Sequence, residues 1–298
     1  MSTIPADVAV AGAAPATRPV APRRRDRRSI LVFGIPLGVL ILVSLVASWL
    51  PLPDPNRQML RDSKLPPLLF GGSWDHPLGT DLLGRDMLSR LVHGGQLALI
   101  LGIGGTLAGL LPGVTLGLIG GYRRGWVDAA ISRVVEAQLA LPGIMLAIAI
   151  LVSSGRSVTV IIVVLSLLSW AQYARIVRAE TIALRDRTFV LALRAAGVPT
   201  RRIIFRHLLA NTAGSISVLA ALQVGGMILI ESSLSFLGLG VVAPDISWGA
   251  MLAGGRDQIT QAWWIATLPG VAISLVVLLT NLFADALRRA YDPRQRTY

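Results

Sequence analysis

The sequence contains no cysteine, a single lysine (Lys64) and only three histidines among its 298 residues. Without cysteine the chain has no disulfide framework, no thiol chemistry and no cysteine metal site. Because its one lysine lies outside any G-x-x-x-x-G-K-[ST] pattern, the chain also has no Walker-type phosphate-binding loop. We therefore expect no cofactor in this chain, and any ATP and Mg²⁺ it works with to be bound by partner subunits.

Charge is also scarce, since 15% of residues are charged and 53% are hydrophobic, against about 25% charged in soluble domains. The apolar residues gather in runs of about 20, each long enough to cross a ~30 Å hydrocarbon core. The sequence therefore predicts an all-α membrane protein with six transmembrane helices. The expected spans are 30–50, 96–121, 137–152, 158–173, 212–230 and 265–283.

The net charge of +12 does not indicate a nucleic-acid partner, because no aromatic-studded basic face accompanies it. Most of the 28 basic residues fall in segments that six spans place on one side of the membrane. The positive-inside rule makes that side the cytoplasm and predicts both termini there. The run 30–50 is longer than a signal-peptide core and no A-x-A site follows it, so we expect an uncleaved first span.

These features divide the chain into four parts. We predict a disordered basic cytoplasmic N-terminus (1–29), a first transmembrane helix with an extracytoplasmic segment (30–91), a transmembrane domain with the remaining spans (92–290) and a cytoplasmic tail (291–298). Within the second span, glycines recur every four residues from Gly105 to Gly121. Such a face lets another helix approach closely.

The longest polar stretch between apolar runs is 175–211. Helix formers fill 188–196, and Gly197 followed by Pro199 ends that helix as a glycine C-cap and proline do. A second, basic helix is expected to begin at Thr200 as N-cap. A short helix, a glycine turn and a basic helix between two spans predict a docking element.

Few residues suggest chemistry. Ser73, Asp75 and His76 lie within four residues of one loop, whereas a catalytic triad converges from separate places. No paired histidines or carboxylates suggest a metal site, and no catalysis is expected. Glu231 follows an apolar run without a nearby basic residue, which leaves three roles open: holding a gate with Ser235, binding a substrate amine, or hydrogen-bonding a neighbouring helix.

Four stretches resemble the C-type permease subunits of dipeptide and oligopeptide ATP-binding-cassette importers, and the resemblance covers about 30–294. They are H-P-L-G-T-D-L-L-G-R-D-M-L-S-R (76–90), G-G-Y-R-R-G-W-V-D (120–128) with L-A-L-P (139–142), E-S-S-L-S-F-L-G-L-G (231–240) with S-W-G-A-M-L (247–252), and L-P-G (268–270) with N-L-F-A-D-A-L-R-R-A-Y-D-P-R (281–294). The resemblance implies the type I importer transmembrane fold.

The resemblance also implies that segment 186–207 is the coupling segment that docks on an ATPase. The family pattern E-A-A-x-x-x-G with a later proline is kept at Ala192 and Gly197 and replaced at Leu191, Leu193 and Ala210. The implied ATPase-coupling residues are Arg187, Thr188, Phe189, Leu191, Ala192, Arg194, Ala195, Gly197, Val198, Arg201 and Arg202.

The implied assembly is a heterodimer with a homologous permease, two ATPase subunits or one fused ATPase, and an extracytoplasmic substrate-binding protein, in the lipid of a bacterial inner membrane. Peptide is the expected cargo, with nickel, glutathione or another small solute as alternatives. An ion-coupled secondary transporter is the rival from another class. We find neither an internal repeat nor a buried carboxylate–histidine chain that would favour it. A membrane-anchored binding or scaffold protein is a further alternative.

Overall fold

The computed structural model describes residues 24–291, so the predicted N-terminal segment up to residue 23 and the tail from 292 lie outside the described residues. The helices are α1 (Arg24–Leu45), α2 (Met87–Tyr122), α3 (Trp126–Ala140), α4 (Gly143–Ser154), α5 (Val158–Arg185), α6 (Thr188–Ala195), α7 (Thr200–Arg202), α8 (Leu209–Phe236), α9 (Trp248–Gly255) and α10 (Trp264–Tyr291). Within the described part, no strand forms beyond one isolated bridge between Thr80 and Asp86. Helix α1 begins inside the segment 1–29 that was predicted to be disordered.

Five helical stretches are long and apolar enough to cross a membrane: 28–45, 87–122, 158–185, 200–236 and 264–290. The third span predicted at 137–152 falls across two helices. Helices α3 and α4 are bent by 84° at their junction and give a sixth span if counted together. The break falls at Leu141, whose ψ of 133° is extended, because a residue before proline (here Pro142) is disfavoured in the helical region.

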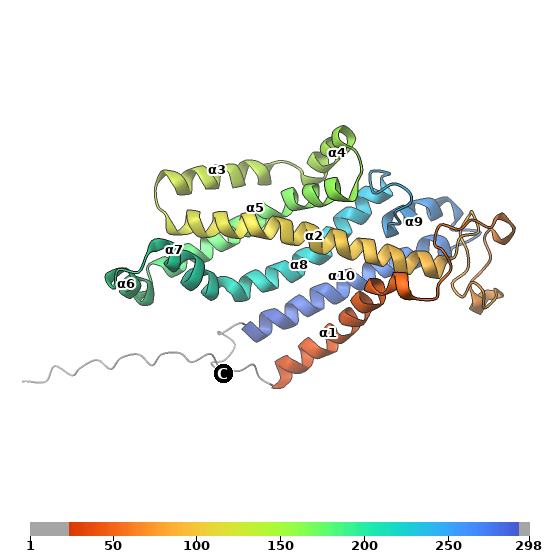
Figure 1. Cartoon of the computed structure of the whole chain (residues 1–298), viewed down its shortest axis with the longest axis horizontal. Helices are drawn as coiled ribbons and strands as arrows, with labels where there is room; N and C mark the ends of the chain where they lie inside the picture. The colour runs from red at the N-terminus through yellow and green to blue at the C-terminus, as the bar shows by residue number, and fades with distance from the viewer. Residues whose placement is uncertain (1–23, 292–298) are drawn as a thin grey trace, which may run out of the picture.

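The bundle is elongated, with α6 and α7 at one end and α9 with the loop 46–86 at the other (Figure 1). We call these the α6 end and the α9 end. Helices α1 and α10 pack side by side along one edge, and α3 runs along α2 and α5 at the opposite edge. Helix α1 begins, and α10 ends, toward the α6 end (Figure 1).

Helices α2 and α5 form the closest pair, and the predicted glycine face lies in their contact. A Cβ added at Gly105 would lie 2.5 Å from the Leu165 Cβ, and one at Gly121 would lie 2.6 Å from the Thr181 Cβ. Real Cβ atoms essentially never approach another atom this closely, so these positions admit only glycine unless the two helices shift. The close approach predicted from the four-residue spacing is confirmed, and it joins α2 and α5 into one packing unit.

Candidate functional site

The coupling segment 186–207 lies at the α6 end (Figure 1). Helix α6 is anchored by Val190, whose side chain is fully buried against Val114, Val177 and Ile203. Gly197 ends the turn after α6 at φ +73°, and the Val198 N–H donates to the Leu193 carbonyl at 3.0 Å. The predicted glycine turn is confirmed, since a residue in the left-handed region closes the helix.

The sequence had suggested a separate basic helix after Gly197, but the structure has none. Helix α7 continues through a π-helical stretch, Ile203–Leu208, directly into α8. Thr200 does not cap it, because Pro199 occupies the N-cap position without a side-chain hydrogen bond. Nothing between 200 and 236 breaks the helix, so the turn at Gly197 connects to a continuous helix that runs toward the α9 end.

The predicted coupling residues form the exposed tip of this end. Among them Phe189 is 38% and Leu191 49% exposed, and only Val198 is half-buried. The exposed members are Arg187, Thr188, Phe189, Leu191, Ala192, Arg194, Ala195, Gly197, Arg201 and Arg202. Exposed apolar side chains bordered by arginines are typical of a protein-binding surface.

Arg194 is also held within the chain. Its Nε donates to the Tyr122 hydroxyl at 3.0 Å, and its guanidinium carbon lies 4.8 Å from the centre of the Tyr122 ring. At the start of the segment, the Arg124 Nη2 lies 2.9 Å from both carboxylate oxygens of Asp186. The end of α2 and the α2–α3 connection therefore hold the start of the segment and the end of α6, a pairing that the spacing in the sequence did not reveal.

Deeper contacts fix this connection to α5. The Arg178 guanidinium binds the Asp128 carboxylate through two hydrogen bonds of 2.5 and 2.9 Å. The Arg185 Nη1 donates to the Gly121 carbonyl at 2.7 Å, which satisfies a carbonyl at the end of α2. The segment 120–128 thus binds α5 as well as α6.

Glu231 and Ser235 lie near the α9 end of α8. The Glu231 side chain is 1% exposed, and its Oε1 accepts from the Ser235 hydroxyl at 2.6 Å and from the Ser247 hydroxyl at 2.9 Å. The Ser247 Oγ in turn accepts from the Gly249 N–H and caps α9. Of the three roles left open by the sequence, this geometry supports a hydrogen bond to a neighbouring helix.

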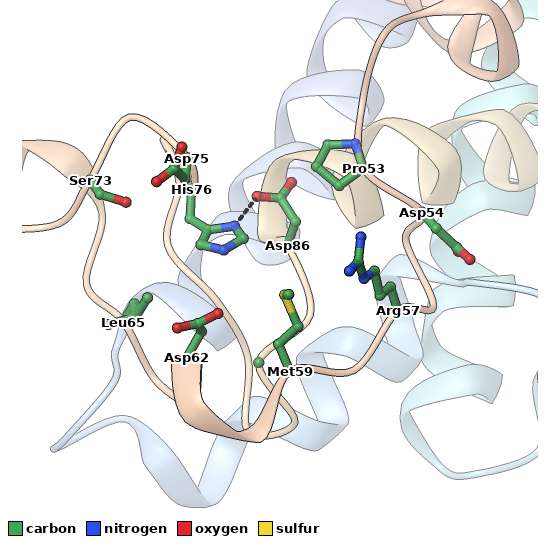
Figure 2. Close-up of a pocket in the computed structure, with 11 residues that line it drawn as sticks. Pro53, Asp54, Arg57, Met59, Asp62, Leu65, Ser73, Asp75, His76 and Asp86 are labelled. Carbon is green, nitrogen blue, oxygen red and sulfur yellow. Dashed lines mark hydrogen bonds and ion pairs between the residues drawn. The ribbon is translucent and has the colours of Figure 1, made fainter.

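The loop before α2 encloses a cavity of about 410 Å³ whose lining includes His76, Asp86 and Arg57 (Figure 2). The His76 Nδ1 lies 2.9 Å from the Asp86 Oδ2, while the Asp86 Oδ1 accepts from the Ser89 N–H at 2.7 Å and caps α2. In the described residues, the Ser73 hydroxyl makes no hydrogen bond to the His76 side chain, and no metal-binding group of side chains is found. The motif 76–90 therefore builds the start of α2.

Comparison with known proteins agrees with this architecture. The family model of the binding-protein-dependent transport system inner membrane component matches residues 113–297. The chain belongs to this family. Its helices form the type I importer transmembrane fold that the sequence predicted.

Named relatives cover most of the chain. It is 40% identical over 258 residues to a di/tripeptide transport system permease of Pseudomonas aeruginosa (86% of this chain, 85% of the relative). It is 37% identical over 278 residues to a dipeptide transport system permease of Bacillus subtilis (92% and 85%). It is 40% identical over 227 residues to a glutathione transport system permease of Pectobacterium atrosepticum (76% and 75%).

Proposed function

We propose that this chain is a non-catalytic permease subunit of an ATP-binding-cassette importer and forms half of the pathway for di- and oligopeptides. The observation that carries the proposal is the 40% identity to a di/tripeptide permease over 86% of the chain. The exposed α6 surface supports it, because a secondary transporter has no use for a protein-binding tip. Glutathione is the second candidate cargo, since a glutathione permease is equally similar over a shorter length.

The assembly that follows contains a homologous permease, two ATPase subunits or one fused ATPase that bind ATP and Mg²⁺, and an extracytoplasmic binding protein. The α6 end and both termini then face the cytoplasm of a bacterial cell. ATP must bind one arrangement of the complex more tightly than the other to drive the spans between them. The continuous α7–α8 helix supplies a rigid connection from the docking tip to the middle of the membrane.

The test is reconstitution of the complete complex in vesicles after purification in mild detergent. We expect a second permease and Walker-motif ATPases to co-purify, and uptake of dialanine to require ATP and the binding protein. Uptake that follows an ion gradient and survives ATP depletion would contradict the proposal. Uptake of glutathione in place of dialanine would support the proposed importer and show that its cargo is glutathione.

Replacing Gly197 tests whether transport needs the left-handed backbone at this position or only the space that glycine leaves. No atom lies within 4 Å of a Cβ added there, yet its φ is +73°. Left-handed backbone costs an ordinary residue about 1–2 kcal/mol, and asparagine tolerates it best. Gly197→Val should therefore lower dialanine uptake per ATP hydrolysed by about 10-fold, since 1.36 kcal/mol is a factor of ten. Gly197→Asn should stay close to the parent, and an equal loss in both variants would contradict a conformational role.

Removing the contact between Arg194 and Tyr122 is expected to weaken the coupling between ATP hydrolysis and cargo uptake. A hydrogen bond together with an exposed cation–π contact stabilises by about 1 kcal/mol, a factor of about 5. Arg194→Leu and Tyr122→Leu should each reduce uptake per ATP by that factor, and the double variant should be no worse than either. Arg133→Leu, on an exposed site of α3 outside the coupling segment, is the control, because no hydrogen bond or ion pair of its side chain is found in the described residues. Losses that add in the double variant would show that Arg194 acts independently of Tyr122.

A further inference from the structure

Two glutamine side chains meet near the midpoints of α5 and α8. The Gln223 Nε2 donates to the Gln172 Oε1 at 3.2 Å. Gln223 is 9% exposed, whereas Gln172 is exposed. This single bond leaves the Gln172 amide N–H donors and the Gln223 Oε1 acceptor without a hydrogen-bond partner in the described residues, on two side chains that touch each other.

The space beside the pair is open. A Cβ added at Gly226, one turn along α8, would meet only the Gln223 Oε1, at 3.8 Å. From Gln172 toward the α6 end, the exposed face of α5 follows the helical period and carries no large apolar side chain. Its exposed residues are Gln172, Arg175, Ala179 and Ala183.

This face differs from the surface that α1 presents. Only 11% of the apolar stretch 28–45 of helix α1 is buried. Its exposed side chains include large apolar ones that suit lipid, such as Ile35 and Leu42, each 60% exposed. An amide that faces the hydrocarbon of the membrane loses its hydrogen bonds to water and is strongly disfavoured. Polar groups within membrane spans face the bundle interior or a water-filled cavity. The Gln172 face is therefore not a lipid-facing surface.

We propose that Gln172 and Gln223 line the aqueous transport pathway and bind the backbone amide groups of the cargo. This inference rests on the proposed importer function and deepens it. A free N–H donor next to a free carbonyl acceptor matches the C=O and N–H of a peptide group. Every peptide carries these groups whatever its side chains, so the pair gives a contact that does not depend on peptide sequence.

The absence of cysteine from the chain allows a direct accessibility test in the full complex in vesicles. Gln172→Cys should react with a charged, water-soluble methanethiosulfonate reagent, and Ile35→Cys on the lipid-facing surface of α1 should not. Saturating dialanine, or glutathione if the parent complex transports that instead, should slow the reaction by about 5-fold or more, as occupancy of a contacted site does. An unreactive Gln172→Cys would mean that lipid or the second permease covers the face, which overturns the inference. If Gln172→Cys reacts at the same rate with and without cargo, the proposed contact between Gln172 and the cargo is contradicted.

Uptake kinetics test the same pair without cysteine. Gln172→Leu and Gln223→Leu should each raise the KM of uptake by about 10-fold, as expected when a substrate hydrogen bond is lost. Gln138→Leu on α3 makes the same chemical change away from the pair and should leave KM unchanged. Unchanged KM values in assembled Gln172 and Gln223 variants would overturn the inference alone, whereas a parent complex without ATP-driven uptake would overturn the proposed function.

Discussion

Gly117→Leu is expected to prevent recovery of folded protein, and Gly117→Ala to lower the free energy of unfolding by about 1–3 kcal/mol. A Cβ at this position would lie 2.7 Å from the Ala174 carbonyl oxygen and 2.9 Å from the Val177 Cβ. The first of these atoms belongs to the backbone of α5 and cannot rotate away. Helices α2 and α5 would have to separate, and in a membrane their association depends on packing rather than on the hydrophobic effect.

Gly120→Ala on the same helix is the control for Gly117. Its nearest neighbour would be the Ile131 Cδ1 at 3.4 Å, the far end of a flexible side chain. There alanine should gain about 1 kcal/mol of helix propensity over glycine. Monodisperse yield and thermal unfolding in mild detergent measure both variants. Equal destabilisation by both alanines would show that glycine is needed for helix flexibility and not for close approach.

Features with a local or periodic signature were predictable from the sequence. The four-residue glycine spacing predicted the face that α5 contacts, and Gly197 followed by Pro199 predicted the turn after α6. The apolar runs predicted most spans, although α2 begins at Met87 rather than at residue 96. There the polar start of the helix is buried in protein, so hydropathy alone underestimates its length.

Features that depend on distant residues were not predictable. Arg194 was expected among the ATPase-coupling residues, and its additional hydrogen bond to Tyr122 joins residues 72 apart in sequence. The pair of Gln172 and Gln223 is separated by 51 residues and shows no motif. The bend at Pro142 had a local signal, since proline disfavours helix in the preceding residue. Hydropathy is nevertheless continuous across it, so the apolar run alone does not reveal that this span is bent.

Glu231→Leu is expected to destabilise the protein by about 3 kcal/mol or more, because buried donors left without an acceptor each cost about 1–3 kcal/mol. The Ser235 and Ser247 hydroxyls both lose the Oε1 that they share, at 2.6 and 2.9 Å. Ser247 also caps α9, so the hydrogen bond between the start of that helix and α8 is lost. Thermal unfolding of the purified protein measures the loss. Glu136→Leu, on an exposed site of α3, is the control and should change stability by no more than about 0.5 kcal/mol.

Glu231→Gln decides between the roles that the sequence left open. The glutamine oxygen can accept from Ser235 and Ser247 as the carboxylate does, and its nitrogen faces the Ser232 hydroxyl, which lies 3.5 Å from the Oε2. If Glu231 joins α8 to α9 by hydrogen bonds, this variant should keep its stability within about 1 kcal/mol and should keep cargo uptake. If the negative charge holds a gate or binds a substrate amine, stability should be kept while uptake is lost. Because the Ser235 and Ser247 hydroxyls both donate to an oxygen that glutamine also offers, we expect the first result.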